Sequence, residues 1–474
     1  MDLDLAARQE ARELCRKAYE AQMSLREFTQ SQLDAITEAV ASAFASKARE
    51  LAELAVQETG FGNVPDKTEK NKFASRDVLC AIREMKTVGI LSKQEKLWEV
   101  AVPVGVIAAI VPSTNPTSTV CYKALIALKA GNTIVFSPHP KALQCTLLAV
   151  KIVTEAAEKA GAPKGSVSCL TMGSMAGSQE LMSAPEVNLI LATGGPGMVR
   201  AAYSSGKPAI GVGAGNGPAY IHHSADVPHA IDCILRSKSF DNGTVCASEQ
   251  SIIVEEPMTH KVREEAKRRG FFFMDKDQAG ALAKLLFKPG GGLNPKIVGR
   301  SATELAQMAG FTVPEQTKIL VAREQEAGPT RPYSMEKLCP VLAFFIMDSE
   351  EAVLQKAVEV LSHEGSGHTF AIHCTDEAVI RRFAAKIPVS RFLVNTPAAL
   401  GGIGKTTELF PALTLGCGAV GGSSSSNNIS PLDLINIRRV AWGKEEQPRT
   451  APNQDLVEML TEKILQRLGG FPQS

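Results

Sequence analysis

The sequence predicts an α/β fold that consists of two doubly wound α/β domains and a protruding arm. Strands and helices alternate strictly between residues 104 and 212, which is the pattern of a parallel sheet with helices on both faces. A second alternating series follows between residues 250 and 395. Residues 86–104 alternate loosely between apolar and polar side chains, as expected of an exposed hairpin or arm.

The first predicted domain, residues 1–225, begins with a helical block over residues 4–58. A capping box of Thr29 and Gln32 starts one of these helices, and apolar residues follow on one face. Strands are predicted at 104–111, 133–137, 167–170, 188–192 and 209–212, with helices at 118–129, 143–160, 178–184 and 198–204. In such a domain, ligands bind at the carboxyl ends of the strands.

The second predicted domain, residues 226–405, has strand candidates at 250–254, 318–321, 341–346, 369–373 and 391–395. Residues 406–445 are expected to return to the first domain or to an oligomer interface. Residues 446–474 combine a polar, proline-containing linker with an amphipathic helix at 455–468. A helix of this length is marginal alone in water, so its apolar stripe needs a partner.

The charge balance excludes a strongly basic or acidic binding surface. Lysine and arginine total 51 against 50 acidic residues, so no net field recruits nucleic acid or an anionic membrane. The charged N-terminus lacks an apolar signal region, and no apolar stretch reaches the length of about 18–20 residues that a membrane span needs. We therefore expect a cytoplasmic protein.

The cysteines and histidines do not form a metal-binding pattern. Ten cysteines occur without a CxxC pair, and no HExxH motif is present. His222 and His223 are adjacent, so they are expected to point apart in a strand. The sequence therefore predicts reduced cysteines and no metal site.

Three loops that follow predicted strands are candidates for binding a cofactor. VPSTNPTS contains Ser113 and Thr114, FSPHPKA contains Ser137 and His139, and ATGGPGM contains Gly194 and Gly195. Each loop opens a helix, where free backbone N–H groups can hold a phosphate or a ribose hydroxyl. Gly213 lies in GVGAGNG, which looks like a dinucleotide fingerprint but follows the wrong strand, so a structural glycine turn is the simpler interpretation.

Cys246 lies at the centre of the most informative stretch, SKSFDNGTVCASEQSIIVEE from residue 237 on. A helical segment and then turn residues 241–243 precede Cys246, and a β-branched run at 250–254 after it reads as a buried strand. A thiol on such a tight connection can face a cleft from a rigid backbone, as a nucleophile must. A buried, inert cysteine is the alternative for the residue taken alone.

Together these motifs resemble those of the aldehyde dehydrogenase superfamily, and more narrowly those of its CoA-acylating branch. VPSTNP, SPHP, DNGTVCASEQS and EKLCP occur in the same order as in that branch, and the resemblance spans residues 10–445. It extends to the aldehyde dehydrogenase half of bifunctional aldehyde/alcohol dehydrogenases and to stand-alone acylating acetaldehyde and succinate-semialdehyde dehydrogenases. The resemblance implies an aldehyde dehydrogenase-like fold with a cofactor domain, a catalytic domain and an oligomerisation arm, assembled as a homodimer or homotetramer.

The resemblance also implies roles for individual residues. Cys246 is the catalytic thiol, and Asn115, with the backbone N–H of Cys246, stabilises the oxyanion; an Asn-Pro turn residue is the alternative for Asn115. Glu336 holds the nicotinamide ribose. His139 helps with CoA or ribose, and His368 is catalytic or orders the surroundings of the thiol; a structural histidine is an equal alternative for both. The remaining cofactor-binding residues are Ser113, Thr114, Ser137, Gly194, Gly195 and Gly213, of which Gly194 and Gly195 lie beside the pyrophosphate.

The reaction class follows from a departure from the hydrolytic branch of the family. Val212 stands where hydrolytic enzymes carry a glutamate base, and a valine cannot activate water. The resemblance therefore implies that an acyl thioester on Cys246 passes to CoA, with NAD, or alternatively NADP, as the hydride acceptor. The competing hypotheses are a hydrolytic aldehyde dehydrogenase that yields free acid and an inactive scaffold of the same fold.

Two questions stay open at this point. The segment 419–428 departs from the pattern of close family members, so the aldehyde is acetaldehyde, a semialdehyde, sulfoacetaldehyde or another. The linker and helix 455–468 resemble the encapsulation peptides that direct acylating aldehyde dehydrogenases into bacterial microcompartments, which would place the helix against a shell. Packing on the enzyme's own subunit or a neighbouring one is the alternative.

Overall fold

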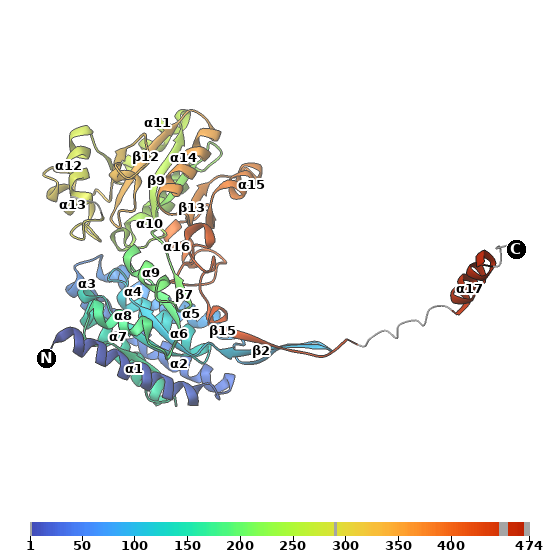
Figure 1. Ribbon diagram of the computed structural model, residues 1–474. Coiled ribbons are helices and arrows are strands. Elements are labelled where there is room, and N and C mark those ends of the chain that lie inside the picture. Colours follow the sequence, from blue (N-terminus) through green and yellow to red (C-terminus); the bar gives the residue numbers. More distant parts are fainter. Residues whose placement is uncertain (1, 289–291, 445–453, 469–474) are drawn as a thin grey trace.

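The computed structural model describes residues 2–288, 292–444 and 454–468, and its strands form three sheets (Figure 1). Five strands form a parallel sheet in the order β5-β4-β3-β6-β7. These strands are β3 (Val106–Ile110), β4 (Thr133–Ser137), β5 (Val167–Cys169), β6 (Val187–Ala192) and β7 (Ala209–Gly211). The order reverses at β3, where ligands of doubly wound sheets bind.

Helices cover both faces of the five-stranded sheet. The apolar faces of α2, α6 and α7 pack in one core cluster, and those of α1 and α8 pack in another. These helices are α1 (Leu3–Leu25), α2 (Gln30–Ser46), α6 (Pro116–Lys129), α7 (Leu143–Lys159) and α8 (Met175–Ser183). The short helix α9 (Pro196–Tyr203) connects β6 to β7. All of α6 is buried, because it is covered by α2, α7 and the segment described next.

A second group of helices packs against α6 and closes one side of this domain. It contains α3 (Ala48–Thr59), α4 (Val64–Lys72) and α5 (Val78–Ile82). A π-helical turn, η1 (Phe73–Asp77), joins α4 to α5. Such turns occur where a helix is distorted, frequently near functional sites.

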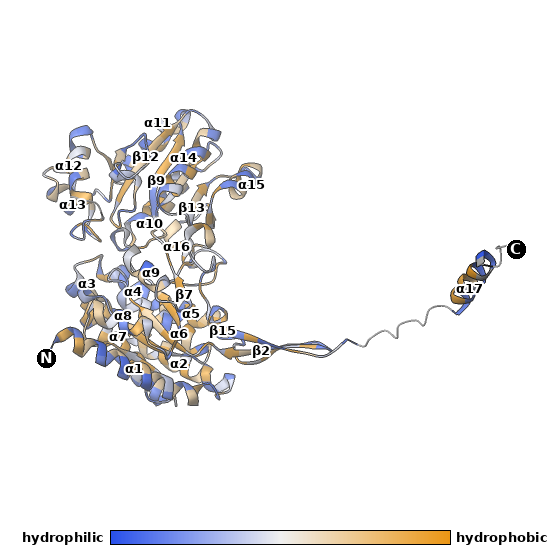
Figure 2. Ribbon diagram, in the orientation of Figure 1, coloured by the Kyte–Doolittle hydropathy of each residue, from blue (hydrophilic) through white to orange (hydrophobic). Residues whose placement is uncertain are grey.

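Seven strands form a second parallel sheet, in the order β10-β11-β12-β9-β8-β13-β14. They are β8 (Gly217–Ile221), β9 (Glu249–Glu255), β10 (Phe271–Phe273), β11 (Ile319–Arg323), β12 (Val341–Met347), β13 (Gly367–His373) and β14 (Val389–Val394). One face is covered by α10 (Val227–Ser239) and α11 (Thr259–Arg268). The other is covered by α12 (Lys276–Leu286), α13 (Ala302–Met308), α14 (Glu350–His363) and α15 (Glu377–Lys386). A short helix, α16 (Ala398–Gly402), follows β14. Figure 2 shows the apolar strands inside both domains.

The third sheet is an antiparallel arm of three strands, which projects from the body in Figure 1. β1 (Gly89–Lys93) and β2 (Leu97–Pro103) form the hairpin expected within residues 86–104. β15 (Ile435–Ala441) pairs with β2 from Ile435 opposite Pro103 to Ala441 opposite Leu97. The C-terminal helix α17 (Gln454–Leu468) follows beyond residues 445–453.

The predicted α/β fold is confirmed, and three strands were missed. β8 begins at the last glycine of the stretch 211–217, which reads as a turn, and β10 has only three residues. β15 is largely exposed, and it forms a strand because it pairs with β2, which lies far away in the sequence. Because β8 belongs to the seven-stranded sheet, that sheet begins before the boundary predicted at residue 226. The functional division of the chain at residues 225 and 405 stays a prediction.

Within the described residues, no helix combines the length and apolarity that crossing a membrane requires.

Candidate active site

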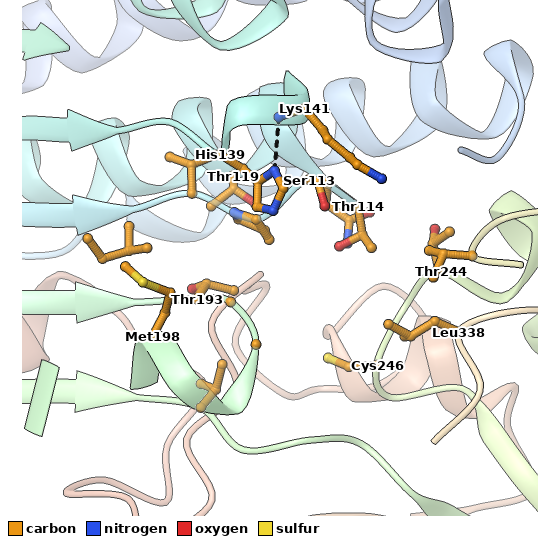
Figure 3. A pocket seen from close by; sticks show the side chains of 18 of the residues that line it. Ser113, Thr114, Thr119, His139, Lys141, Thr193, Met198, Thr244, Cys246 and Leu338 are labelled. Carbon is orange, nitrogen blue, oxygen red and sulfur yellow. Dashed lines mark hydrogen bonds between the residues drawn. The ribbon is translucent and has the colours of Figure 1, made fainter. Parts of the chain in front are cut away.

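A cavity of about 670 Å³ lies where the carboxyl ends of the five-stranded sheet meet the loop that carries Cys246 (Figure 3). One part of its lining comes from the residues after β3, β4, β6 and β7. The facing part comes from residues 244–246 and 336–338. Figure 3 shows the Cys246 thiol directed into the space between these parts.

The loop around Cys246 is held by an unusual backbone. α10 runs into a 3-10 turn, η3 (Phe240–Gly243), in which Asp241 and Asn242 adopt positive φ angles of 48° and 52°. β9 then begins at Glu249. On the opposite side, a Cβ on Gly215 would lie 1.8 Å from the Cys246 carbonyl oxygen. Gly215 therefore lets two segments meet behind the thiol, which supports a structural role for the GVGAGNG stretch.

The surroundings of the Cys246 thiol favour its protonated form. Burial, and then the nearby Glu336 carboxyl group, raise the pKa of Cys246 to about 12, while Arg391 opposes this shift. A thiolate is the reactive form of cysteine. The predicted role of Cys246 as a nucleophile therefore requires loss of this proton when the site is filled.

Asn115 stands at the entrance of α6, yet its side chain does not cap that helix. Its Nδ2 donates to Thr114 Oγ1 over 3.2 Å, and its Oδ1 accepts a hydrogen bond from Lys70 Nζ. Both Asn115 and Cys246 line the cavity. This arrangement favours the oxyanion role over that of a turn residue, because one Nδ2 hydrogen stays available for the cavity.

Glu336 supplies the one carboxyl group among the described residues that line the cavity. Its Oε1 accepts a hydrogen bond of 2.9 Å from the backbone N–H of Gly215. Burial, and then the neighbouring Glu364, raise the pKa of Glu336 to about 8. The group is therefore largely neutral near pH 7 in the resting enzyme.

All eight residues predicted to bind the cofactor line the cavity, namely Ser113, Thr114, Ser137, His139, Gly194, Gly195, Gly213 and Glu336. Gly195 is the N-cap of α9, so that helix directs free N–H groups to this wall, as phosphate binding requires. His139 Nδ1 accepts from the Lys141 N–H over 3.1 Å (Figure 3). Burial, and then Lys141, lower the pKa of His139, so the ring is neutral. These residues fit a nicotinamide dinucleotide, but their individual roles stay predictions.

His368 is not among the residues that line the cavity. Its Nδ1 lies 2.9 Å from Thr369 Oγ1, and its buried Nε2 has no hydrogen-bond partner among the described residues. Burial, and then the Arg391 guanidinium, lower the pKa of His368 to about 3. A direct catalytic role therefore stays a prediction, and the present contacts favour an indirect one.

Val212 lines the cavity and is 5% exposed. It follows β7 on the same sheet edge as the cofactor loops. The position expected for a water-activating glutamate therefore presents an apolar side chain to the cavity.

His222 and His223 do not point apart, contrary to the prediction from strand alternation. Both follow the end of β8 at Ile221, so alternation no longer applies, and their ring centroids lie 3.8 Å apart. Together with Glu255 they offer potential ligand atoms within 4.8 Å of one another. This group lies where β8 and β9 of the seven-stranded sheet end, and none of its residues lines the cavity.

Lys70 and Asp241 were not predicted as site residues, yet the structure brings both of them to the side-chain amide of Asn115. Lys70 lines the cavity, and Asp241 is buried behind it. Lys70 belongs to a polar helical stretch that resembles a solvated surface. Only the pairing of α4 with η3, which lies far along the chain, gives it a role.

The sequence matches the profile of the aldehyde dehydrogenase family over residues 1–270. The chain belongs to the aldehyde dehydrogenase family. The predicted resemblance and fold are thereby confirmed.

Relatives of this aldehyde dehydrogenase include bifunctional aldehyde-alcohol dehydrogenases and enzymes named as acetylating. The bifunctional aldehyde-alcohol dehydrogenase AdhE of Escherichia coli is 44% identical over 466 residues, which are 97% of this chain and 51% of AdhE. The chain thus spans about half the length of this curated relative. The crystal structure of an acetylating aldehyde dehydrogenase from Geobacillus thermoglucosidasius superposes with a TM-score of 0.93 at 49% identity, covering 95% of this chain and 100% of the other.

A third similar protein is associated with a bacterial microcompartment. It is a propionaldehyde dehydrogenase from the fucose utilisation microcompartment of Clostridium phytofermentans, with a TM-score of 0.82 and 29% identity. The alignment covers 92% of this chain and 98% of the other. These similarities support the predicted CoA-acylating activity.

Proposed function

We propose that this aldehyde dehydrogenase is CoA-acylating and catalyses the reversible reaction aldehyde + CoA + NAD⁺ ⇌ acyl-CoA + NADH + H⁺. The observation that carries the proposal is that the Cys246 thiol, the Asn115 amide and the apolar side chain of Val212 line the same cavity, with no carboxylate at residue 212 to act as a hydrolytic base. Such a site can form a thioester but lacks that base for passing it to water.

In the first half-reaction, the Cys246 thiolate attacks the aldehyde carbon, and the carbonyl oxygen becomes an alkoxide. Asn115 Nδ2 and the backbone N–H of Cys246 donate to that oxygen, which lowers the barrier because the donors are already in place. A nicotinamide held at this cavity by residues such as Glu336 would supply the acceptor for the hydride that leaves the former aldehyde carbon. The product on the enzyme is a thioester of Cys246.

In the second half-reaction, the sulfur of CoA attacks the thioester carbon. The same two donors hold the second oxyanion, and its collapse expels the Cys246 thiolate and releases acyl-CoA. The CoA thiol needs less activation than water near neutral pH. Because Val212 offers no base that could activate water, the acyl group passes to CoA.

We propose a short, uncharged aldehyde as the substrate. The cavity lining is largely apolar where Val245, Leu338, Leu413 and Leu415 contribute to it. Lys70, a cation in this lining, is already bound to the Asp241 carboxylate. An anionic semialdehyde would therefore find little charge compensation, and acetaldehyde should give a higher kcat/KM than succinate semialdehyde.

We propose that NAD is used and that NADP is accepted as well. The segment after β4, residues 138–141, carries no carboxylate of the kind that binds the ribose 2′-hydroxyl in NAD-specific enzymes. Lys141 at this position would instead accommodate a 2′-phosphate. Comparison of kcat/KM for the two cofactors tests this proposal.

The decisive experiment is incubation with acetaldehyde and NAD, with and without CoA. We expect NADH formation that depends on CoA and yields acetyl-CoA in equal amount. Equal NADH formation without CoA, with acetate as product, would indicate the hydrolytic alternative. No NADH under either condition, across a panel of short aldehydes and with NADP, would support the inactive scaffold.

We propose that the enzyme assembles as a homodimer or homotetramer through its arm. β15 forms one edge of the three-stranded sheet, and its exposed side chains include Ile437 and Val440. Trp442, just beyond this strand, packs edge-on against Trp98 with ring centroids 4.9 Å apart. Light scattering of the wild type and of Val440→Lys tests whether this edge carries the interface.

We propose that α17 is a detachable contact to a microcompartment shell, with the enzyme otherwise located in the cytoplasm. Its apolar residues form one face of the helix (Figure 2), and Leu456, Leu460 and Ile464 are exposed. The ten free cysteines fit a reducing compartment. Truncation after Lys444 should leave kcat and oligomeric state unchanged, whereas dissociation would indicate a subunit contact.

A further inference from the structure

A buried cluster of three charged residues and one threonine lies directly behind the side-chain amide of Asn115. It consists of Lys67 and Lys70 from α4, and of Asp241 and Thr244 from the segment that leads to Cys246. The side chains of Lys67, Lys70 and Asp241 are at most 3% exposed. Burying charges is costly unless they are paired and hydrogen-bonded, so such a cluster needs an explanation.

The two lysines share one carboxylate but have different further partners. Lys67 Nζ donates to Asp241 Oδ2 over 2.9 Å and to the Thr114 carbonyl oxygen over 2.8 Å. Lys70 Nζ donates to the same Asp241 oxygen, to Thr244 Oγ1 over 3.3 Å, and to Asn115 Oδ1. Only Lys70 of this pair therefore touches the catalytic side chain.

Asp241 is fixed in its place by its backbone and its neighbours. Its φ angle of 48° is rare for a residue other than glycine. Its N–H donates to Asp66 Oδ2 over 2.7 Å, and its Oδ1 accepts from the Asn63 N–H over 2.9 Å. A Cβ on Gly62 would come within 1.8 Å of Asp241 Oδ1, so a glycine is needed there. These contacts hold the carboxylate as a rigid anchor for both lysines.

The cluster contains two ammonium groups and one carboxylate. Burial lowers the pKa of Lys70 to about 8, although Asp241 opposes this shift. For Asp241 itself, burial raises the pKa, but Lys67 and Lys70 outweigh burial and lower it. The three buried side chains thus carry one more positive than negative charge, which the neighbouring Asp66 carboxylate partly offsets, and Lys70 lies one hydrogen bond away from the proposed oxyanion site.

The contact with Lys70 also determines how the amide of Asn115 is oriented. A lysine ammonium has only donors, so the atom that faces it must be the amide oxygen. The NH₂ group then turns to the opposite side, where one hydrogen bonds Thr114 Oγ1. The second hydrogen is left for the cavity, where the oxyanion would form.

We propose that Lys70 is a positioning residue for the oxyanion in the reaction proposed above. It holds Asn115 with its NH₂ group toward the reacting oxygen, and its charge polarises the amide so that this group donates more strongly. Asp241 anchors both lysines, and Lys67 donates to the Thr114 carbonyl oxygen without touching the Asn115 side chain. The inference rests on the proposed function for the identity of the reaction, but any oxyanion formed at Cys246 would report on it.

The test compares Lys70→Met with Lys67→Met, a matched control one helical turn away. Each substitution removes one ammonium and leaves a one-to-one ion pair with Asp241, so both variants are expected to fold. With acetaldehyde, NAD and CoA, Lys70→Met should lower kcat about 10- to 100-fold, the range for losing one charged hydrogen bond. Lys67→Met should lower kcat at most a few-fold. KM should change little in both variants.

Two further measurements separate positioning from general disruption. The double variant Lys70→Met/Asn115→Ala should turn over as fast as Asn115→Ala alone, because Lys70 acts through that amide. Alkylation of Cys246 by iodoacetamide forms no oxyanion, so its rate in Lys70→Met should match the wild type. Equal kcat losses in the two lysine variants, or losses that multiply in the double variant, would overturn the inference.

The inference stays testable if the proposed function is wrong or if Lys70→Met does not fold. Acylation of Cys246 by p-nitrophenyl acetate passes through an oxyanion and needs neither NAD nor CoA, so its burst rate should fall in Lys70→Met by the same factor. Thr244→Val removes the hydroxyl that accepts from Lys70 and donates to Asp241, keeps both charges in place, and is the milder variant. It should slow acylation several-fold in the wild-type background and not at all in Asn115→Ala. A burst rate that neither Lys70→Met nor Thr244→Val lowers in the wild-type background would overturn the inference, whereas absent NADH formation with a normal burst would overturn only the proposed function.

Discussion

The cavity has two ends that are built differently, a cofactor end where we propose that the dinucleotide binds and a chemical end that holds the proposed nucleophile. At the cofactor end, Ser137, His139 and Gly195 lie at or just beyond the ends of β4 and β6 of one sheet. At the chemical end, Asn115 and Cys246 come from separate domains, and buried ionic contacts join their supports. Cofactor binding thus follows from the sheet itself, whereas reactivity depends on a few long-range contacts. Changes at the chemical end should lower kcat, and changes at the cofactor end should raise KM.

The largest effect is expected from Cys246→Ala. The thiol is the only group proposed to carry the acyl chain, so both NADH formation and acyl transfer to CoA should be abolished. The exposed Cys80 provides a matched control, and Cys80→Ala should keep full activity. Substantial CoA-dependent NADH formation by a folded Cys246→Ala variant would show that Cys246 is not the nucleophile.

The next largest effect is expected from Asn115→Ala. Loss of one oxyanion donor lowers kcat by about 10²–10³-fold. Asn115→Asp is the matched variant, because it can keep the contact with Lys70 while removing the NH₂ donor, and it should be at least as slow. A loss confined to KM, or a lower melting temperature with normal kcat, would instead identify Asn115 as a turn residue of α6.

The same contrast explains what could be predicted from the sequence. The five strands at 106–110, 133–137, 167–169, 187–192 and 209–211 are apolar and regularly spaced, so periodicity located them, and the loops at their ends were located with them. Cys246 was recognisable because its motif is continuous in the sequence. Such features are local, and local patterns suffice to find them.

The missed features depend on contacts between distant segments. Lys70 and Asp241 are separated by 171 positions, and nothing in either stretch indicates that the other will bury it. The close approach of the His222 and His223 rings depends on the chain leaving β8 at Ile221, which alternation alone does not indicate. Edge strand β15 likewise owes its pairing to distant β2. The chemical end was therefore predicted as a set of residues but not as an electrostatic network.

A smaller effect is expected at the cofactor end, from His139→Ala. The neutral ring lines the cavity after β4 and touches the backbone of Lys141 rather than Cys246 or Asn115. We expect KM for NAD or for CoA to rise several-fold, with kcat within about twofold, since one neutral hydrogen bond contributes roughly 0.5–1.5 kcal/mol. Initial rates at varied NAD and varied CoA identify the affected ligand. If kcat instead fell by as much as Asn115→Ala lowers it, His139 would have to take part in the chemistry.

The smallest effect, and the sharpest test of the branch within the family, is expected from Val212→Glu. A glutamate at this position would place a carboxylate in the cavity that contains Cys246. Burial should raise its pKa, so the basic form and any hydrolysis should increase as the pH rises from slightly acidic to alkaline. We expect a low rate of acetate formation without CoA, since a base must also reach an ordered water.

Val212→Gln is the matched control for this substitution, because it has nearly the same shape and no base. It should form no acetate without CoA, while both variants should retain CoA-dependent activity. Acetate and acetyl-CoA can be quantified separately in the same reaction. Hydrolysis by the glutamine variant would show that water can attack the thioester without a base at residue 212. Glu336 or bulk solvent would then be sufficient to accept the proton of that water. A folded glutamate variant that forms no acetate at any pH would contradict the placement of Val212 at the base position. The preference for CoA would then have to come from exclusion of water by the apolar lining rather than from the missing carboxylate.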